Sequence, residues 1–169
     1  MYLNVKNKRG FTLIELLIVI AIIAILAAVV FVSLDPLRRF KDTRDSRRWQ
    51  DVTNIMTAIK LEQIDGGGYY LSVIDNMASD TVYMIGTSGT TCSDHNANCD
   101  TNVAGINYCV DLADLVTDGY LAAIPINPNG TGNWSALTTG YTLERDTSND
   151  GLYVRSCESE NSTEIYVVR

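Results

Sequence analysis

The stretch "KRGFTLIELLIVIAIIAILAAVVFVSL", Lys8 to Leu34, decides the fold of this chain. From Leu16 to Val32 it contains no polar side chain, and with its flanks it reaches the roughly 20 residues that a helix needs to cross a membrane. It is longer than the apolar region of a secretory signal, which is about 7–15 residues, and it lacks the A-x-A cleavage signature. We therefore expect this segment to stay on the mature protein.

Glu15 lies near the start of this apolar segment, where a carboxylate is costly. On insertion scales, an acid inside a membrane helix costs about 2.5–3.5 kcal/mol of free energy. The preceding cations are Lys8 and Arg9, and the next ones, Arg38 and Arg39, follow about six helical turns later. Two interpretations stay open: the side chain reaches the membrane surface, or a cation of another molecule neutralises it.

The residues from Lys8 to Val29 resemble the class III signal and N-terminal helix of type IV pilins and of type II secretion pseudopilins. The resemblance implies that a membrane-embedded prepilin peptidase cuts after Gly10 and N-methylates the new first residue, Phe11. It also implies that Glu15, then the fifth residue, pairs with the terminal amine of a neighbouring subunit during assembly. Such a partner would explain why an acid is carried into lipid.

From the resemblance we expect a structural subunit of a type IV pilus or related filament, and not an enzyme. The subunit would form a helical homo-oligomer with the help of an inner-membrane assembly platform. It would start as a single-pass protein of the bacterial inner membrane, with its head outside the cytoplasm, and end in a cell-surface filament. One alternative is the major pseudopilin of a type II secretion system. Another is a minor pilin at a filament tip that acts as an adhesin or DNA receptor, although the resemblance implies that tip subunits often lack the acid found here as Glu15.

The charge of the chain is divided unevenly. Residues 1–10 carry three cations, residues 11–64 carry seven cations and six acids, and residues 65–169 carry three cations and fourteen acids. Such an acidic C-terminal part repels phosphates, which argues against nucleic acid as a partner and leaves cations as candidate ligands. Within it we find no nucleophile beside a base and no phosphate-binding loop, so we assign no catalytic residues.

These patterns predict an α+β protein with the ladle shape of type IV pilins. A leader, 1–10, precedes a long helix over residues 11–64, with a membrane and assembly half at 11–34 and a head-packing half at about 37–63. Pro36 should interrupt the helix. Beyond it, Val52, Ile55, Met56, Ile59 and Ile64 recur at helical spacing, and three glycines, 66–68, end the helix.

Residues 65–169 should form a small globular head with an antiparallel sheet. The runs "GYTLER", "LYVRSC" and "TEIYVV" read as strands, "TVYMIG" as a weaker fourth strand, and "YCVDLADLV", Tyr108 to Val116, as a short helix with Cys109, Leu112 and Val116 on one face. The segment Gly119–Gly130 resembles the link that precedes the sheet in major pseudopilins.

Six cations and two acids lie between Arg38 and Arg48. The simpler interpretation is a solvated helical stretch with three pairs at i,i+4 spacing: Arg38 with Asp42, Lys41 with Asp45, and Arg47 with Asp51. The functional interpretations are binding to lipid headgroups and ion pairing with acidic heads of adjacent subunits.

All cysteines, Cys92, Cys99, Cys109 and Cys157, lie in the head. In an exported domain an even number predicts disulfides, here with three connectivities. We favour Cys92 with Cys99, which bracket a short loop, and Cys109 with Cys157. The alternative is a metal site in "CSDHNANC", which contains His95.

The stretch "ERDTSNDGLY", Glu144 to Tyr153, is a candidate calcium loop. Asp146, Ser148 and Asp150 alternate ahead of a glycine and supply oxygens of the kind that calcium binds. Major pseudopilins carry a calcium site in a similar place. The same residues also suit a hairpin turn without a metal. Three sequons, at Asn129, Asn133 and Asn161, are short enough to arise by chance.

Overall fold

The computed structural model describes residues 10–87, 92, 96–128, 130–146, 148–149 and 151–169. The chain divides into two compact units, Met1–Arg39 and Phe40–Arg169. The second unit is called the head below. It is larger than the predicted head because it includes most of the second half of the long helix.

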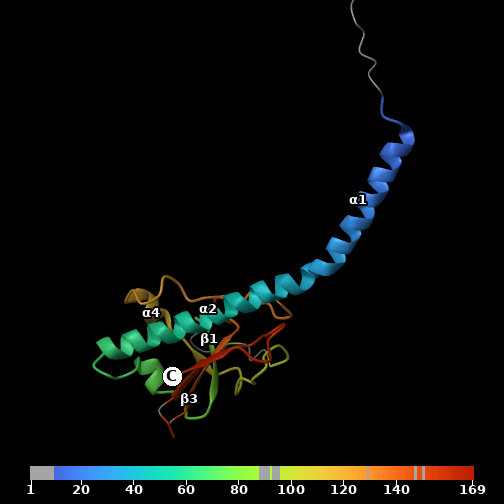
Figure 1. Ribbon diagram of the computed structural model, residues 1–169. Coiled ribbons are helices and arrows are strands. Elements are labelled where there is room, and N and C mark those ends of the chain that lie inside the picture. Colours follow the sequence, from blue (N-terminus) through green and yellow to red (C-terminus); the bar gives the residue numbers. More distant parts are fainter. Residues whose placement is uncertain (1–9, 88–91, 93–95, 129, 147, 150) are drawn as a thin grey trace, which may run out of the picture. The chain divides into compact units, whose positions relative to one another are not determined.

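The predicted N-terminal helix is present as α1, Leu13–Leu34, followed by α2, Pro36–Asp65 (Figure 1). The interruption predicted at Pro36 falls one residue earlier, at Asp35, whose backbone is left-handed with φ 35°. Pro36 is then the first residue of α2, a position where the missing N–H of proline costs nothing. Gly67 and Gly68, with φ 76° and 100°, follow α2 and end it as predicted.

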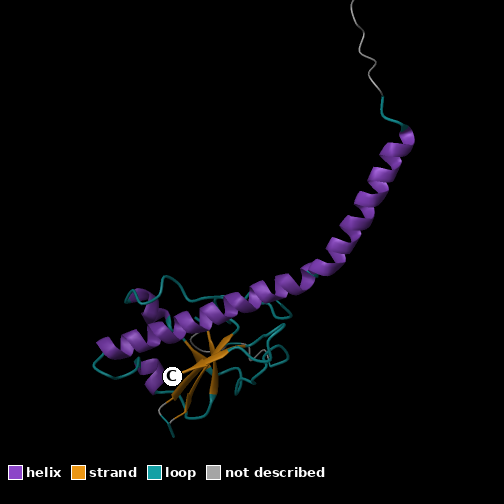
Figure 2. Cartoon of the chain, viewed as in Figure 1, coloured by secondary structure: helices purple, strands orange, loops and turns teal. Residues whose placement is uncertain are grey.

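The head contains a five-stranded sheet, shown in orange in Figure 2. Its strands have the order β2-β1-β3-β4-β5. The bounds of the head's remaining elements are α3 Ser72–Asp75, β1 Val82–Ile85, β2 Cys109–Val110, α4 Ala113–Thr117, β3 Tyr141–Asp146, β4 Gly151–Ser156 and β5 Tyr166–Val168.

The sheet is mixed and not wholly antiparallel as predicted. β1, β3, β4 and β5 pair antiparallel, but β2 runs parallel to β1, with Met84 opposite Cys109. The long connection between β1 and β2 allows this, since parallel neighbours need a crossover far longer than a hairpin turn. The four predicted strands are confirmed, and β2 is an addition to them.

The helix predicted over Tyr108–Val116 is wrong in its first half. Cys109 and Val110 form β2, and only Ala113–Thr117 forms the short helix α4. Leu112 and Leu115 still enter the core, whereas Val116 is only half buried. Pairing of Cys109 with Met84 in the sheet overrides the local helical spacing, which is a weak preference over so few residues.

One face of α2 packs on the sheet and forms the main core. Val52, Ile55, Met56 and Ile59 are buried on α2, together with Tyr141, Leu143, Leu152 and Val154 on β3 and β4. The predicted apolar face is therefore confirmed at these four helical positions. It does not extend to Ile64, which is 70% exposed.

Candidate assembly site

The N-terminal motif forms a capping box at the start of α1. The backbone N–H and the hydroxyl of Thr12 both donate to Glu15 Oε2, at 3.0 and 2.7 Å, and the Glu15 N–H donates to Thr12 Oγ1 at 3.3 Å. The carboxylate thus has donors within its own chain. This arrangement offsets part of the cost of placing an acid in lipid before any neighbour arrives. The T-x-x-E spacing that signals it was present in the sequence.

The peptide bond between Gly10 and Phe11 lies just outside this helix. Residues 10–12 have no regular structure, Phe11 is 82% exposed, and nothing lies within 4 Å of a Cβ placed on Gly10. A protease needs its target bond extended and free of helical hydrogen bonds. The predicted cleavage site therefore lies outside the helix, and Lys8 and Arg9 of the predicted leader lie outside the described residues.

α1 has no buried residue and no polar face. Its large apolar side chains, from Leu13 to Leu34, are all about half exposed or more. Among the described helices, only the one that starts at Leu13 is long and apolar enough to cross a membrane by length and composition. Such a surface must be covered by lipid or by other chains, because a soluble protein does not leave so large an apolar patch in water.

In the head, a buried cluster of charges joins α2 to the C-terminal segment. Arg48 is fully buried, and Asp45, one turn before it, is 4% exposed. Arg48 donates to Asp45 at 2.8 Å, to Glu160 at 2.9 Å and to Glu158 at 3.3 Å. Its remaining N–H groups reach Asn127 Oδ1 at 2.8 Å and the Pro128 carbonyl at 3.0 Å. All N–H groups of the guanidinium are thus hydrogen-bonded, as burial of a charge requires.

Two of the three acids that Arg48 bonds also receive backbone donors. Asp45 accepts from the N–H groups of Glu160, Asn161 and Ser162, at 2.8 to 3.2 Å. Glu158 accepts from the N–H groups of Thr131 and Gly132. Two loops far apart in the sequence are therefore held on the same stretch of α2 by charge-assisted hydrogen bonds.

These contacts shift the pKa values of the acids. The Arg44 side chain, which bonds Glu160 through two nitrogens, and the Arg48 side chain hold the pKa of Glu160 at about 2, against the effect of burial. Burial alone would raise the pKa of Asp45, but the hydrogen bonds from Asn161, Arg48, Glu160 and Ser162 lower it. Both acids are therefore charged under physiological conditions.

The prediction of a solvated helix over Arg38–Arg48 is wrong at Asp45 and Arg48, which are buried. Asp45 pairs with Arg48 and not with Lys41, and both partners are buried. The predicted pair of Arg47 with Asp51 is confirmed at 3.7 Å. Sequence spacing alone could not reveal the buried cluster, because Glu158 and Glu160 come from more than a hundred residues later.

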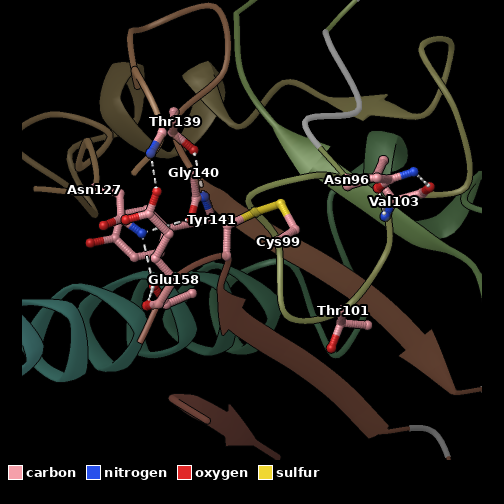
Figure 3. Close-up of a disulfide and its surroundings, with 12 residues drawn as sticks. Asn96, Cys99, Thr101, Val103, Asn127, Thr139, Gly140, Tyr141 and Glu158 are labelled. Carbon is pink, nitrogen blue, oxygen red and sulfur yellow. Dashed lines mark hydrogen bonds between the residues drawn. A yellow bond between two sulfur atoms is a disulfide. The ribbon is translucent and has the colours of Figure 1, made fainter. Parts of the chain in front are cut away.

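The head has two disulfides, but their pairing differs from the one we favoured. Cys92 bonds Cys109, and Cys99 bonds Cys157. Both bridges fasten the segment between β1 and β2. The first joins this segment to β2. The second, at Cys99 in Figure 3, joins it to the residue that follows β4. The favoured pairing assumed Cys109 on a helix, whereas its place in β2 beside β1 brings it to Cys92.

These disulfides take two of the ligands that the zinc alternative needs. Cys92 and Cys99 are oxidised and cannot act as thiolate ligands, and His95 lies outside the described residues. Across the part of the chain that the structure describes, no group of three or more metal-binding side chains is found.

The candidate calcium loop forms the turn between β3 and β4. Asp146 accepts from the Ser148 N–H at 2.8 Å and from Asn149 Nδ2 at 3.0 Å, and the backbone bond from Ser148 is the main cause of its lowered pKa. Asp150, the third predicted ligand, lies outside the described residues. The turn interpretation accounts for the observed bonds of Asp146.

Comparison with known proteins places the N-terminal segment. Residues 5–31 match the family described as the prokaryotic N-terminal methylation motif. This match contains Gly10, Phe11, Thr12 and Glu15, and extends through most of α1. No curated protein and no solved structure matches the chain.

Proposed function

We propose that this chain is a precursor of the type IV pilin and pseudopilin kind, because residues 5–31 match the prokaryotic N-terminal methylation motif, and that it matures into a structural subunit of a type IV pilus or related filament. The motif implies processing by prepilin peptidase, membrane anchoring before assembly, and filament assembly in general. We assign the cut to the Gly10–Phe11 bond, the methyl group to the amine of Phe11, and the assembly contact to Glu15.

The observation that carries this proposal is α1 itself. It has 22 residues and buries none of them. Lipid covers such a helix in the membrane, but outside the membrane only other chains can do so. A parallel bundle of α1 helices from many copies meets this need, since the same apolar surface repeats on each copy and a helical polymer brings them together.

Glu15 gives this packing a register. Loss of the leader creates a positive amine on Phe11, four residues from the carboxylate. In one subunit the capping box holds the acid with neutral donors from Thr12. A neighbour's amine offers an opposite charge in the same low-dielectric surroundings, where an ion pair is strong. A subunit out of register would leave both charges unpaired in lipid.

The head suits a structural role because buried charges hold α2 to the C-terminal loop and a disulfide holds the start of that loop to another part of the head. The Arg48 cluster ties the first turns of α2 in the head to residues 158–162. The Cys99–Cys157 disulfide then ties residue 157 to the segment between β1 and β2. The contacts of α2 with residues 158–162 are therefore ionic, and the loop that provides them is anchored by a disulfide next to it.

A second candidate is the major pseudopilin of a type II secretion system. It is favoured by the segment Gly119–Gly130, which resembles the link before the sheet in those proteins. Here Asn127 of that segment is 2% exposed, and its side chain donates to the Gly140 carbonyl at 2.9 Å and to Ser156 Oγ at 2.7 Å. The segment is thus fixed to β4 and to the residue before β3.

Electron microscopy of cells with and without this gene tests the proposal. We expect surface filaments that contain the chain and that disappear with the gene. Mass spectrometry of those filaments should find an N-terminal methylated Phe11. Absence of filaments together with loss of secreted proteins would favour the pseudopilin, and an intact Met1 on assembled protein would overturn both candidates.

A further inference from the structure

The two ends of the head, taken along α2, carry side chains of opposite charge. At one end, Lys41 lies in the first turns of α2 within the head. At the other end, α2 finishes among acids. Lys41 and Glu62 are about 32 Å apart along the helix at 1.5 Å per residue. Figure 1 shows α2 running the length of the head, with α4 beside its C-terminal part.

The Lys41 end is hollow and polar. A cleft of about 500 Å³ is lined by Lys41, Arg44, Gly130, Thr131, Ser159 and Glu160. Arg44 is committed to Glu160 through two hydrogen bonds. Within the described residues, no ion pair is formed by Lys41, which is exposed. The cleft therefore contains a cation that no carboxylate of the described residues pairs with.

The opposite end gathers acids: among the described residues Asp114 and Asp118 form no ion pair, whereas Asp75 pairs with Arg145 at 2.9 Å. Asp114 and Asp118 of the α4 region are exposed, and they lie close enough to Glu62 to help raise its pKa, after burial, along with Asp75. Asp65 accepts from the Tyr120 hydroxyl at 2.9 Å. The last turn of α2, the negative pole of its dipole, has no basic residue. Lys60 is directed to Gln63 and Tyr70.

The cleft with its cation lies at one end of the head, and the unpaired acids lie at the other end. They cannot meet within one copy, but the cleft of one copy can contact the acids of a second copy. Parallel copies that are shifted along the direction of α2 bring such opposite ends together, in a head-to-tail contact that repeats without closing. We propose that the Lys41 cleft receives the acidic end of the head of a second copy, with the Lys41 ammonium paired to Asp114 or Asp118 of that copy. This inference rests on the proposed filament.

The lysine content makes a direct test practical. After the leader is removed, Lys41 and Lys60 are the only lysines in the chain. A zero-length carbodiimide reagent joins an ammonium to a carboxylate only where they touch. Treated filaments should yield a peptide that links Lys41 to the segment Ala113–Asp118, and the span of α2 excludes this link within one copy.

Substitutions of Lys41 test whether assembly depends on its positive charge or on the lysine itself. Lys41→Arg keeps the charge, so we expect normal filaments without the cross-link. Lys41→Glu should lower filament yield at least about tenfold, because like charges across a contact cost several kcal/mol. Asp114→Lys with Asp118→Lys should lower it similarly. Filaments should return when Lys41→Glu and both acid reversals are combined in one chain.

The outcomes distinguish this inference from the proposed function. Wild-type filaments that show no Lys41 link, together with full assembly of Lys41→Glu, would overturn the inference and leave the filament proposal standing. Failure of the combined variant to restore assembly, with the disulfides and melting temperature of the head unchanged, would also overturn it. Absence of any wild-type filament would remove both.

Discussion

The Arg48 guanidinium lies 2.8 Å from the Asp45 carboxylate one turn away on α2, and both side chains are buried. Burial removes the water that would normally stabilise both charges. The pair is stable because Glu158, Glu160 and three backbone N–H groups complete its hydrogen bonds. The pair therefore belongs to a structural joint between α2 and the C-terminal loop, and its removal should affect the whole head.

Replacing Arg48 by Ala should destabilise the head by about 3–5 kcal/mol, because it leaves two acids buried without their cation. Urea unfolding of the fragment Phe40–Arg169 would measure this loss. Arg48→Lys is the matched control: it keeps the charge but not the planar set of donors, so its loss should be smaller. Equal stability of wild type and Arg48→Ala would contradict the assigned role of the cluster.

The head should lose stability in acid partly through Glu160. The folded-state pKa of this group, about 2, lies below its ordinary value of 4.5. Its contribution is therefore present above about pH 4.5 and is lost as the pH falls toward 2. Melting temperatures of the same fragment should be measured from pH 6 down to about pH 2, and we expect them to decrease as the pH drops below about 4.5. Glu160→Gln should lower the melting temperature at neutral pH and flatten its dependence on acid.

Glu15 substitutions should separate helix capping from ion pairing. Glu15→Ala removes both, and the subunit should stay in the membrane but fail to enter filaments. Glu15→Gln keeps an oxygen that can accept from the Thr12 N–H, yet it carries no charge for a neighbour's amine. If charge is the register signal, Glu15→Gln should also fail to assemble, as judged by sheared filament yield. Normal yield from Glu15→Gln would assign the role to the cap.

Peptide mapping without reduction should find Cys92 linked to Cys109 and Cys99 linked to Cys157. The sequence separations of 17 and 58 give about 3 and 4 kcal/mol of stabilisation by chain entropy. Replacing the second pair by serine should therefore cost more stability than replacing the first. Peptides that contain Cys92 linked to Cys99 would show that the described pairing is wrong.

Calcium binding by Asp146, Ser148 and Asp150 stays a proposal. If the ion binds there, it should raise the melting temperature of the head, and Asp146→Ala with Asp150→Ala should abolish that rise. The hydrogen bonds of Asp146 to Ser148 and Asn149 would have to be partly given up. Equal melting temperatures in calcium and in excess chelator would leave the stretch as a hairpin turn.

The membrane-length helix, its interruption near Pro36 and the four antiparallel strands were predictable from the sequence. Each depends on local chemistry: a continuous apolar run, a proline, alternating strand residues and three glycines. The N-terminal methylation motif, which contains Gly10, Phe11 and Glu15, was recognisable from its resemblance to a known family, and the roles of these residues stay proposals. The capping box between Thr12 and Glu15 is also local, since the T-x-x-E spacing of the sequence is its signature.

Only the tertiary structure decided the partners of residues that meet across long separations. Arg48 looked like one of six solvated cations, and burial beside Glu158 and Glu160 depends on how the C-terminal loop crosses α2. Cys109 carried a helical pattern, and its place beside Met84 in a parallel strand pair decided both its conformation and its disulfide. Local sequence fixes the elements because their periodicity is short-range, whereas charge burial and cysteine pairing follow from contacts that exist only after the chain has folded.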